Sequence, residues 1–230
     1  MVTVDVSRPA VAVRAARRWL AAIQSRAADC LVKLRQKKPG EADDIERSAR
    51  ARDGATEGTP VRMPLPVYLC ATKYDTLAKT DPALHRIVLT SLRAAALEHG
   101  AAMFCFSRTD RVLLGHARAA LAAAAFGSES KRVVLLDSSK PIVSPFGSDS
   151  AANIGAAPDA PGLPSGSSAS DPEDSEPWVR AVDAIAPMTK EEEKAWREES
   201  KVRKGAGTSR ASFEDEAARY PEPAVDALRL

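Results

Sequence analysis

The sequence predicts an α/β fold in which a parallel sheet carries helices on its faces. Two short apolar runs, residues 66–71 and 101–106, have the length and composition of strands buried on both faces. A helix-like segment lies between these runs, and a second one follows residue 106. Alternating strands and helices imply crossovers that leave the strands parallel.

The leading segment, residues 1–38, is predicted to hold an amphipathic helix of the α/β domain over residues 10–37. Its apolar residues recur at the three-four spacing of one helical face: Ala16, Trp19, Leu20, Ile23, Ala27, Cys30, Leu31 and Leu34. The segment has nine basic and two acidic residues, a net charge of +7. Such a charge is typical of a solvated helix face or of a surface for an acidic partner. Pro39-Gly40 ends the helix, and residues 39–64 are predicted to be a polar linker.

Residues 65–137 are predicted to be the C-terminal half of the α/β domain. Asp81 is a favourable N-cap with Pro82 at the first helical position, and Gly100 suits the left-handed residue that ends this helix. Thr109 or Asp110 caps a second helix that runs to Phe126 and ends at Gly127. A third strand is expected over Arg132–Asp137. Because two or three strands rarely make a stable parallel sheet, the first half of the domain is expected to be missing.

The remaining sequence is predicted to be mostly extended. Residues 138–170 are rich in Ser, Pro, Gly, Ala and Asp and are expected to be extended or disordered. The apolar island Pro141–Phe146 interrupts them and is predicted to be a docking segment. In residues 171–230, with a net charge of −5, a short helix is expected from Glu176 to about Ala186. The highly charged stretch after it is expected to be a solvated helix or a disordered tail.

Composition and isolated residues exclude several function classes. The whole chain has 33 basic and 31 acidic residues, a net charge of +2, which argues against direct nucleic-acid binding. No apolar run approaches the roughly 20 residues of a membrane-spanning helix. Cys30, Cys70 and Cys105 form no metal-binding pair and are expected to be buried free thiols. The three histidines have no metal-ligand spacing either, so no metal site is predicted.

The tetrad Thr72-Lys73-Tyr74-Asp75 follows directly on the first predicted strand. In nucleotide-binding α/β folds, ligands lie beyond the carboxyl ends of the strands, where this loop is expected. An aspartate in such a loop can accept hydrogen bonds from guanine N1 and N2, while the lysine stem packs on the base. Ser107 follows the next strand, where GTPases place a second base-contacting loop. Thr72, Lys73, Asp75 and Ser107 are therefore a candidate guanine-type site.

The phosphate-binding half of a nucleotide site is not in this sequence. No G-x-x-x-x-G-K-[ST] motif occurs, so no such loop supplies the backbone amides, lysine and magnesium hydroxyl on which phosphoryl transfer depends. We therefore predict that the chain is not an enzyme and holds no cofactor. A turn in which Asp75 bonds its own backbone is the alternative to a live guanine site.

An ordered set of motifs resembles a known family. It comprises Val67–Asp75, a helix to Glu98–Ala101, Phe104–Ser107, Leu113-Leu114, Ala124–Gly127, Lys140–Ile142, Phe146–Asp149, Asn153–Gly155 and Trp178. In order and spacing it resembles the light intermediate chain of the second cytoplasmic dynein, the motor of retrograde intraflagellar transport. The resemblance covers residues 10 to about 190.

This resemblance implies a partial Ras-like, P-loop-type domain used as a scaffold. It implies a subunit that binds and stabilises the dynein-2 heavy chain, meets other dynein-2 subunits and serves cilium assembly. The expected locations are the cytoplasm, cytoskeleton, cilium or flagellum and basal body. Partner contacts are expected at Ile142, Phe146, Ile154 and Trp178. Because the chain begins after the usual place of the family's phosphate loop, we expect a truncated sequence or a short homologue whose sheet a partner completes.

Two other functions stay open at this stage. One is a small GTP-binding regulator whose phosphate-binding loop is missing from this chain. The other is an adaptor whose basic helix at residues 10–37 contacts anionic lipid or acidic protein.

Overall fold

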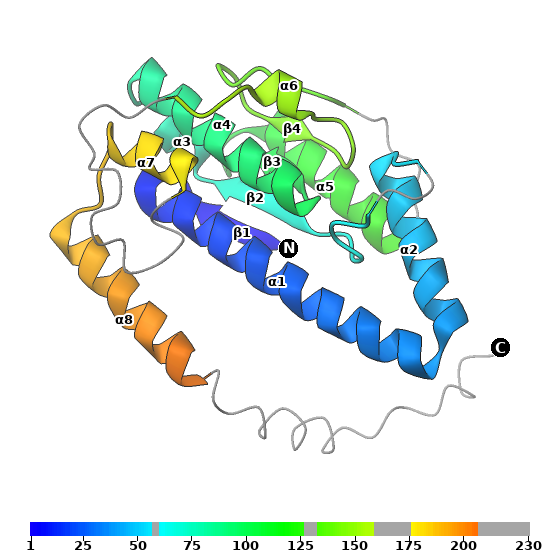
Figure 1. The fold of residues 1–230 in the computed structure, drawn as a ribbon. Helices are drawn as coiled ribbons and strands as arrows, with labels where there is room; N and C mark the ends of the chain where they lie inside the picture. The colour runs from blue at the N-terminus through cyan, green and yellow to red at the C-terminus, as the bar shows by residue number, and fades with distance from the viewer. Residues whose placement is uncertain (57–59, 127–132, 159–175, 207–230) are drawn as a thin grey trace. The chain divides into compact units, whose positions relative to one another are not determined.

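In the computed structural model of the chain, four strands form one sheet in the order β1-β2-β3-β4 (Figure 1). Three strands are parallel: β1 (Val2–Asp5), β2 (Tyr68–Thr72) and β3 (Ala102–Cys105). The short β4 (Val143–Ser144) runs antiparallel to β3. The predicted α/β class, with a mostly parallel sheet and flanking helices, is confirmed.

The structure describes residues 1–56, 60–126, 133–158 and 176–206. The chain divides into two compact units, Met1–Pro187 and Met188–Leu230. The sheet and the helices around it belong to the first unit. In the second unit, α8 (Lys190–Ala206) is a single charged helix with three glutamates in its first turn. The charged stretch is therefore helical to Ala206, one of the two predicted alternatives.

One face of the sheet is covered by α1 (Pro9–Lys37) and α4 (Pro82–His99), which pack against each other. The strand register places on that face Val2, Val4, Leu69, Ala71, Met103 and Cys105, all of them buried. On the opposite face α5 (Arg111–Phe126) contacts β3. A small cluster of Ala102, Phe104 and Val143 forms the core there.

The predicted helix boundaries are confirmed where capping residues mark them. Asp81 accepts hydrogen bonds from the backbone amides of Ala83 and Leu84 at the start of α4. Gly100 closes that helix in the left-handed conformation with φ +67°. Asp110 in turn accepts hydrogen bonds from the first amides of α5, which reaches the predicted end at Phe126. The expected stop at Gly127 lies outside the described residues.

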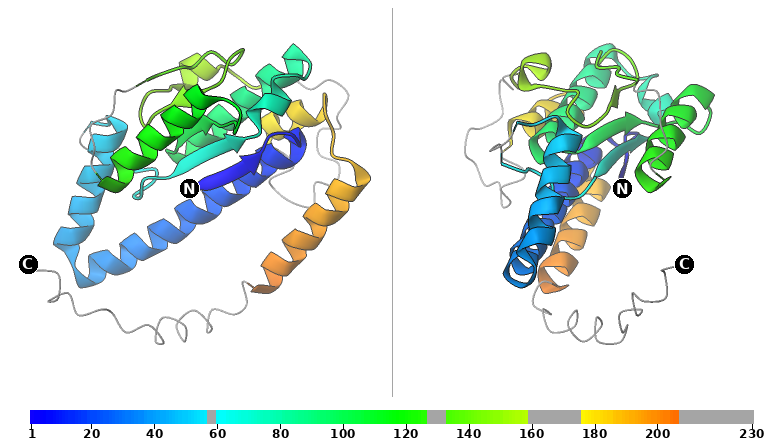
Figure 2. Two further views of the ribbon diagram at one scale, coloured as in Figure 1. Left: turned by 180° about the vertical axis from the view of Figure 1, so that it is seen from behind. Right: turned by 90° about the vertical axis from the view of Figure 1, so that its right-hand side faces the viewer.

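The predicted linker at 39–64 is wrong in its first part. Pro39 ends α1 as expected but begins a new helix, α2 (Pro39–Asp53). Its mean hydropathy is low, and it is held by buried Ala42 and Ala49 and by ion pairs of Glu46 with Arg35 and Arg50. Figures 1 and 2 show the far ends of α1 and α2 extending beyond the strands as an arm. The stabilising contacts are thus between helices, which the polar sequence of 39–64 does not reveal.

Two strand predictions also need correction. The segment 1–38 begins with a strand, β1, which was not predicted. The expected third strand over Arg132–Asp137 is not one: within the described residues 133–137 only an isolated antiparallel bridge joins Leu135 to Val143. The place beside β3 is taken instead by β4, from the apolar island, because its Val143 and Ser144 pair with Phe104 and Met103.

Residues 138–158 are the described part of the segment predicted to be extended or disordered; most of them are extended or in turns, and contacts with the rest of the unit hold them. Besides β4 this part contains α6 (Ala151–Ile154), capped by Ser150. Asp149 forms a bidentate ion pair with Arg93 on α4, both N–O distances being 2.8 Å. Residues 159–170 lie outside the described residues. The short helix predicted from Glu176 is confirmed as α7 (Pro177–Asp183).

Candidate functional site

A cluster of polar side chains lies where the three parallel strands end. Asp5 is the last residue of β1, Thr72 the last of β2, and Ser107 follows β3. Lys73 and Asp75 belong to the turn between β2 and the short α3 (Tyr74–Leu77). The four predicted site residues are therefore brought to one edge of the sheet, together with Asp5.

Lys73 has a left-handed backbone with φ +59°, an uncommon conformation for a residue other than glycine. Its ammonium Nζ lies 2.5 Å from Oδ2 of Asp5. The Thr72 hydroxyl donates a hydrogen bond of 2.9 Å to the carbonyl of Val4 and so ties β2 to β1. Burial alone raises the pKa of Asp5, but hydrogen bonds from Lys73 and Ser7 outweigh burial and hold that pKa below its usual value.

Asp75 is held by the loop that follows β3. The Ser107 hydroxyl donates a hydrogen bond of 2.7 Å to Oδ1 of Asp75 and lies 2.9 Å from the Thr109 hydroxyl. Ser107 is only 1% exposed, so its geometry is set by packing. In the same turn the Tyr74 amide donates to the carbonyl of Phe106. The carboxylate of Asp75 is thus fixed in place by its neighbours, and one oxygen already has a donor.

Tyr74 turns away from this edge into the core. Its hydroxyl lies 3.1 Å from Nε2 of His85, and the two rings meet edge to face. Burial raises the pKa of Tyr74 to about 12, with Cys105 and Asp110 adding to the effect. The pair therefore joins α3 to α4 with both groups uncharged at neutral pH.

The buried histidines predict a loss of stability in mild acid. Burial lowers the pKa of His85 below 6.5. Burial also lowers the pKa of His99, where Glu98 opposes the effect and Arg17 adds to it. Near and below pH 6.5, these histidines therefore bind protons more readily in the unfolded chain than in the folded chain. We expect the free energy of unfolding to fall between pH 7.5 and 5.5, by at most about 1.4 kcal/mol per pH unit for each histidine.

Urea titrations at several pH values measure this dependence. The double variant His85→Gln/His99→Gln serves as the control, because glutamine keeps a hydrogen-bonding side chain and does not titrate. Its stability is expected to vary less with pH in this range. The same slope in the variant and the wild type would rule out these histidines as the cause.

The charged partners of the site were not predicted. Asp5 and Ser7 precede the helix predicted over residues 10–37, in a stretch for which no element was predicted. The alternation Val2, Val4, Val6 around Asp5 is the signal in the sequence, since residues at spacing two line one face of a strand. Chemically, the cluster offers an exposed ammonium and two carboxylates at a sheet edge, with Lys73 already paired to Asp5.

The four predicted partner-binding residues lie in different surroundings. Ile142 has no exposed surface, and Trp178 is 9% exposed. Phe146 is partly buried, with its ring edge to face with Tyr68 and under the guanidinium of Arg52. Ile154, at the end of α6, is partly exposed. Their roles in partner binding stay predictions, and those of Ile142 and Trp178 would have to act through the surfaces that these buried residues support.

Two ion pairs hold α7, which carries the buried Trp178, against α1. Arg14 on α1 donates to both carboxylate oxygens of Asp183, the Nη1 bond being 2.7 Å long. Arg17 lies 2.9 Å from Glu176, whose carboxylate also caps α7. Burial raises the pKa of Glu176 although Arg17 opposes this effect. Arg14 and Arg17 therefore stabilise the packing of α7 on α1, in addition to contributing to the positive charge of the leading helix.

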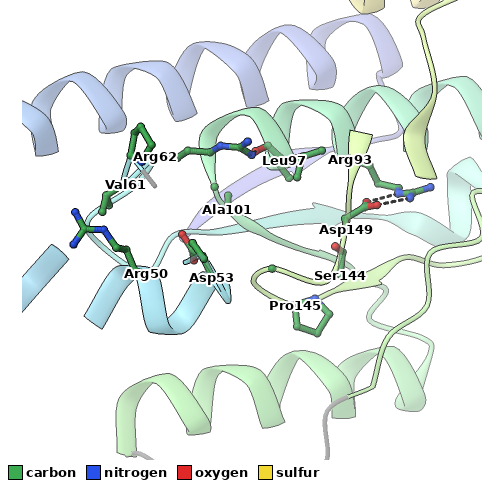
Figure 3. A pocket seen from close by; sticks show the side chains of 15 residues that line it. Arg50, Asp53, Val61, Arg62, Arg93, Leu97, Ala101, Ser144, Pro145 and Asp149 are labelled. Atoms are coloured by element: carbon green, nitrogen blue, oxygen red, sulfur yellow. Dashed lines mark hydrogen bonds and ion pairs between the residues drawn. The ribbon is translucent and has the colours of Figure 1, made fainter. Parts of the chain in front are cut away.

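A cavity of about 220 Å³ with both polar and apolar lining lies between the end of α2, the end of α4 and the loop after β4 (Figure 3). The Arg93–Asp149 ion pair forms one wall, and Asp53 and Pro145 also line the cavity. Arg62 donates a hydrogen bond to the carbonyl of Leu97 across the cavity mouth. Its charged groups all have partners: Arg93 and Asp149 pair with each other, whereas Arg50 pairs with Glu46 and Asp53 with Arg52. The cavity is therefore best described as a junction of three segments.

Cys30 corrects the prediction for the cysteines. Cys70 and Cys105 are buried as expected, and burial raises the pKa of the Cys105 thiol to about 12. Cys30 is exposed, because it lies on the half of α1 that extends into the arm. Among the described residues, no group of His, Cys, Asp and Glu is arranged to hold a metal ion. No helix in the described part of the chain is long and apolar enough to cross a membrane.

Comparison with known proteins gives partial matches to one kind of protein. No family model matches the chain. It is 29% identical over 96 residues to cytoplasmic dynein 2 light intermediate chain 1 of Mus musculus, covering 42% of this chain and 27% of that protein. The Danio rerio protein of the same name is 29% identical over 93 residues, covering 40% and 26%, and the Homo sapiens protein 27% over 96 residues, covering 42% and 27%. The aligned region spans about a quarter of the length of these relatives, and the matches support a relationship to them.

Proposed function

We propose that this chain is a non-catalytic light intermediate chain subunit of a dynein-2 motor. In this role it binds the heavy chain and stabilises the motor for retrograde intraflagellar transport and cilium assembly. The observation that carries the proposal is the agreement of three vertebrate relatives, each named as a dynein-2 light intermediate chain, over some 40% of the chain. The implied locations are the cytoplasm, the cytoskeleton, the cilium or flagellum and its basal body.

We also propose that the α/β unit is part of a Ras-like domain that serves as a scaffold. The parallel order β1-β2-β3 and the polar cluster at the carboxyl ends of these strands support this assignment. The side chains there hold the turns together: Lys73 binds Asp5, and Ser107 binds Asp75. A site used in this way maintains the loop conformation and leaves chemistry to other subunits.

Co-purification tests the subunit role. The tagged full chain is expected to retain a co-expressed dynein-2 heavy-chain tail and to retain a dynein-1 tail much less. Ile154→Asp is expected to weaken retention, because Ile154 is one of the two predicted contacts that are partly exposed. Ala152→Asp on the same short helix is the matched control. Failure to retain the dynein-2 tail would contradict the proposed function. Equal retention of that tail by Ile154→Asp and Ala152→Asp would remove only the contact at Ile154.

A small GTP-binding regulator is the second candidate, favoured by the position of Lys73, Asp75 and Ser107 at one sheet edge. Titration of a fluorescent GDP analogue into the full chain and into Asp75→Asn distinguishes the two. For a scaffold we expect no saturable signal from either protein. Saturable binding to the wild type that Asp75→Asn abolishes would instead establish the guanine site.

A further inference from the structure

The far half of α1 carries an apolar groove that no described residue fills. The groove has a volume of about 390 Å³ and lies between α1, α2 and the segment that leads into β2. Its larger apolar side chains are Trp19, Ile23, Leu31, Leu34, Ile45 and Leu65. Trp19 is 46% exposed and Leu65 52%. A group of large, exposed apolar side chains around an open groove is typical of an interaction site, whereas apolar side chains exposed singly are common on any protein surface.

The groove continues the stripe that buries the first half of the same helix. In that half Val13, Ala16 and Leu20 are completely buried under the rest of the unit. Beyond Leu20 the apolar spacing persists to Leu34, yet only Ala27 is buried. On the other side α2 contributes Ile45 alone to the lining. The sequence thus gives the far half of α1 an apolar packing face that the described residues cover only in part.

Basic residues predominate on the far half of α1, where Asp29 is the one acidic residue. Arg26 lines it, and Lys33 and Lys37 are exposed on the same half of α1. None of these three forms an ion pair among the described residues, whereas Arg35 and Lys38 pair with Glu46 and Glu41 of α2. Acidic side chains on an occupant would therefore find cations that form no ion pair with the described residues.

We propose that this groove binds an amphipathic helix of a partner protein whose apolar face is flanked by glutamate or aspartate. The lining on α1 runs from Trp19 to Leu34, which corresponds to roughly 24 Å of helix and so to an occupant of about 16 residues. Such a helix offers apolar anchors at spacings of three, four and seven residues. The inference is independent of the proposed motor role, since the groove and its charges are properties of α1 and α2.

Fluorescence anisotropy with a designed probe tests the inference on the full chain. The probe is a labelled synthetic helix of about 18 residues, the length that covers the lining, with leucines on one face and glutamates beside them. We expect saturable binding, weakened about tenfold or more by Leu31→Asp because a central apolar anchor is lost. Val32→Asp is the matched control: Val32 is 57% exposed, is not part of the lining and is the next residue along the helix.

Charge selection forms the second arm of the experiment. Arg26→Glu is expected to weaken the glutamate probe several-fold and to strengthen a probe in which lysines replace the glutamates. Circular dichroism of each variant establishes that α1 and the sheet are retained. Equal binding of both probes to the wild type would overturn the acidic specificity, and absence of saturable binding would overturn the proposal.

The same variants distinguish two other possible occupants of the groove, a second copy of this chain and an anionic membrane surface. Sedimentation velocity that shows a dimer of the wild type, abolished by Leu31→Asp, would overturn the proposal in favour of a second copy of this chain. Vesicles of phosphatidylserine and phosphatidylcholine serve for the membrane alternative. Flotation of the wild type with these vesicles, lost in Leu31→Asp and unaffected by competing probe, would overturn it in favour of an anionic membrane surface.

Discussion

Arg93→Met is expected to cost about 3–5 kcal/mol of unfolding free energy, the largest single loss that we expect for a substitution in the chain. The guanidinium is 3% exposed and the carboxylate of Asp149 6%, so neither is solvated when the other is removed. Besides the bidentate pair, Arg93 donates to the carbonyl of Leu136 at 2.7 Å and to the hydroxyl of Ser138 at 3.0 Å. One side chain thus fastens three points of the segment 136–149 to α4.

Urea denaturation of the two single variants and the double variant measures this coupling. Asp149→Leu leaves a buried cation, whereas Arg93→Met/Asp149→Leu removes both charges, so we expect the double variant to lose less than the sum of the singles. If the Arg93→Met variant does not fold, the milder substitution Arg93→Lys measures the contribution of the same ion pair with Asp149. Arg47→Met is the surface control, expected to cost less than about 1 kcal/mol because its pair with Asp44 is exposed. Additive losses would contradict the coupling.

Gly147→Ala is expected to destabilise the fold by roughly 2–4 kcal/mol. The residue has φ +66°, and a Cβ atom there would lie 2.1 Å from the carbonyl oxygen of Asp53 and 2.7 Å from its carbonyl carbon. Backbone cannot yield as a flexible side chain does, so the loop after β4 has to separate from the end of α2. We expect this separation to release the ring of Phe146 from the guanidinium of Arg52 as well, since Phe146 is the preceding residue.

Gly54→Ala isolates the part of this effect that comes from the backbone angle. Gly54 has φ +65°, almost the same as Gly147, and no atom lies within 4 Å of its added Cβ. We therefore expect a cost of about 1–2 kcal/mol, the usual penalty for alanine in the left-handed region. Thermal unfolding of the two variants gives the comparison. Equal losses would show that the contact with Asp53 contributes nothing.

Elements with strong local signals were predictable from the sequence. The helix α4 is an example: the Asp81 cap, Pro82 at its start and the left-handed Gly100 at its end all act within a few residues of the chain. The apolar runs that became β2 and β3 also carry their own signal, because strands buried on both faces need unbroken apolar sequence. For these segments local sequence and tertiary structure require the same conformation.

Elements that depend on distant partners were not predictable. β1 has four residues, and its strand conformation comes from the ladder that joins Val2 to Leu69 and Val4 to Ala71. α2 has a polar sequence and is held to α1 by Glu46 and Arg35. For α2 the stabilising groups lie on another helix, and its polar sequence does not indicate them. For β1 the alternation of Val2, Val4 and Val6 was a local signal, but no local feature indicated the strand with which it pairs.

The candidate site follows the same rule. Thr72, Lys73, Asp75 and Ser107 were predictable together, because parallel strands bring their carboxyl ends to one edge. The pairing of Lys73 with Asp5 was not, since it depends on β1. For the apolar island the pattern indicated burial correctly, but composition alone does not say whether the chain itself or a partner covers a side chain such as Ile142, which is fully buried here.

The helix α1 also has a mechanical consequence. It is an unbroken rod of 29 residues, roughly 43 Å long, with no glycine and no proline after its first residue. Without such residues it has no hinge, so a force applied to its far half is not absorbed by bending. The torque is delivered instead to the near half, which contacts β1, α4 and α7. A load on the arm therefore acts first on the edge of the sheet.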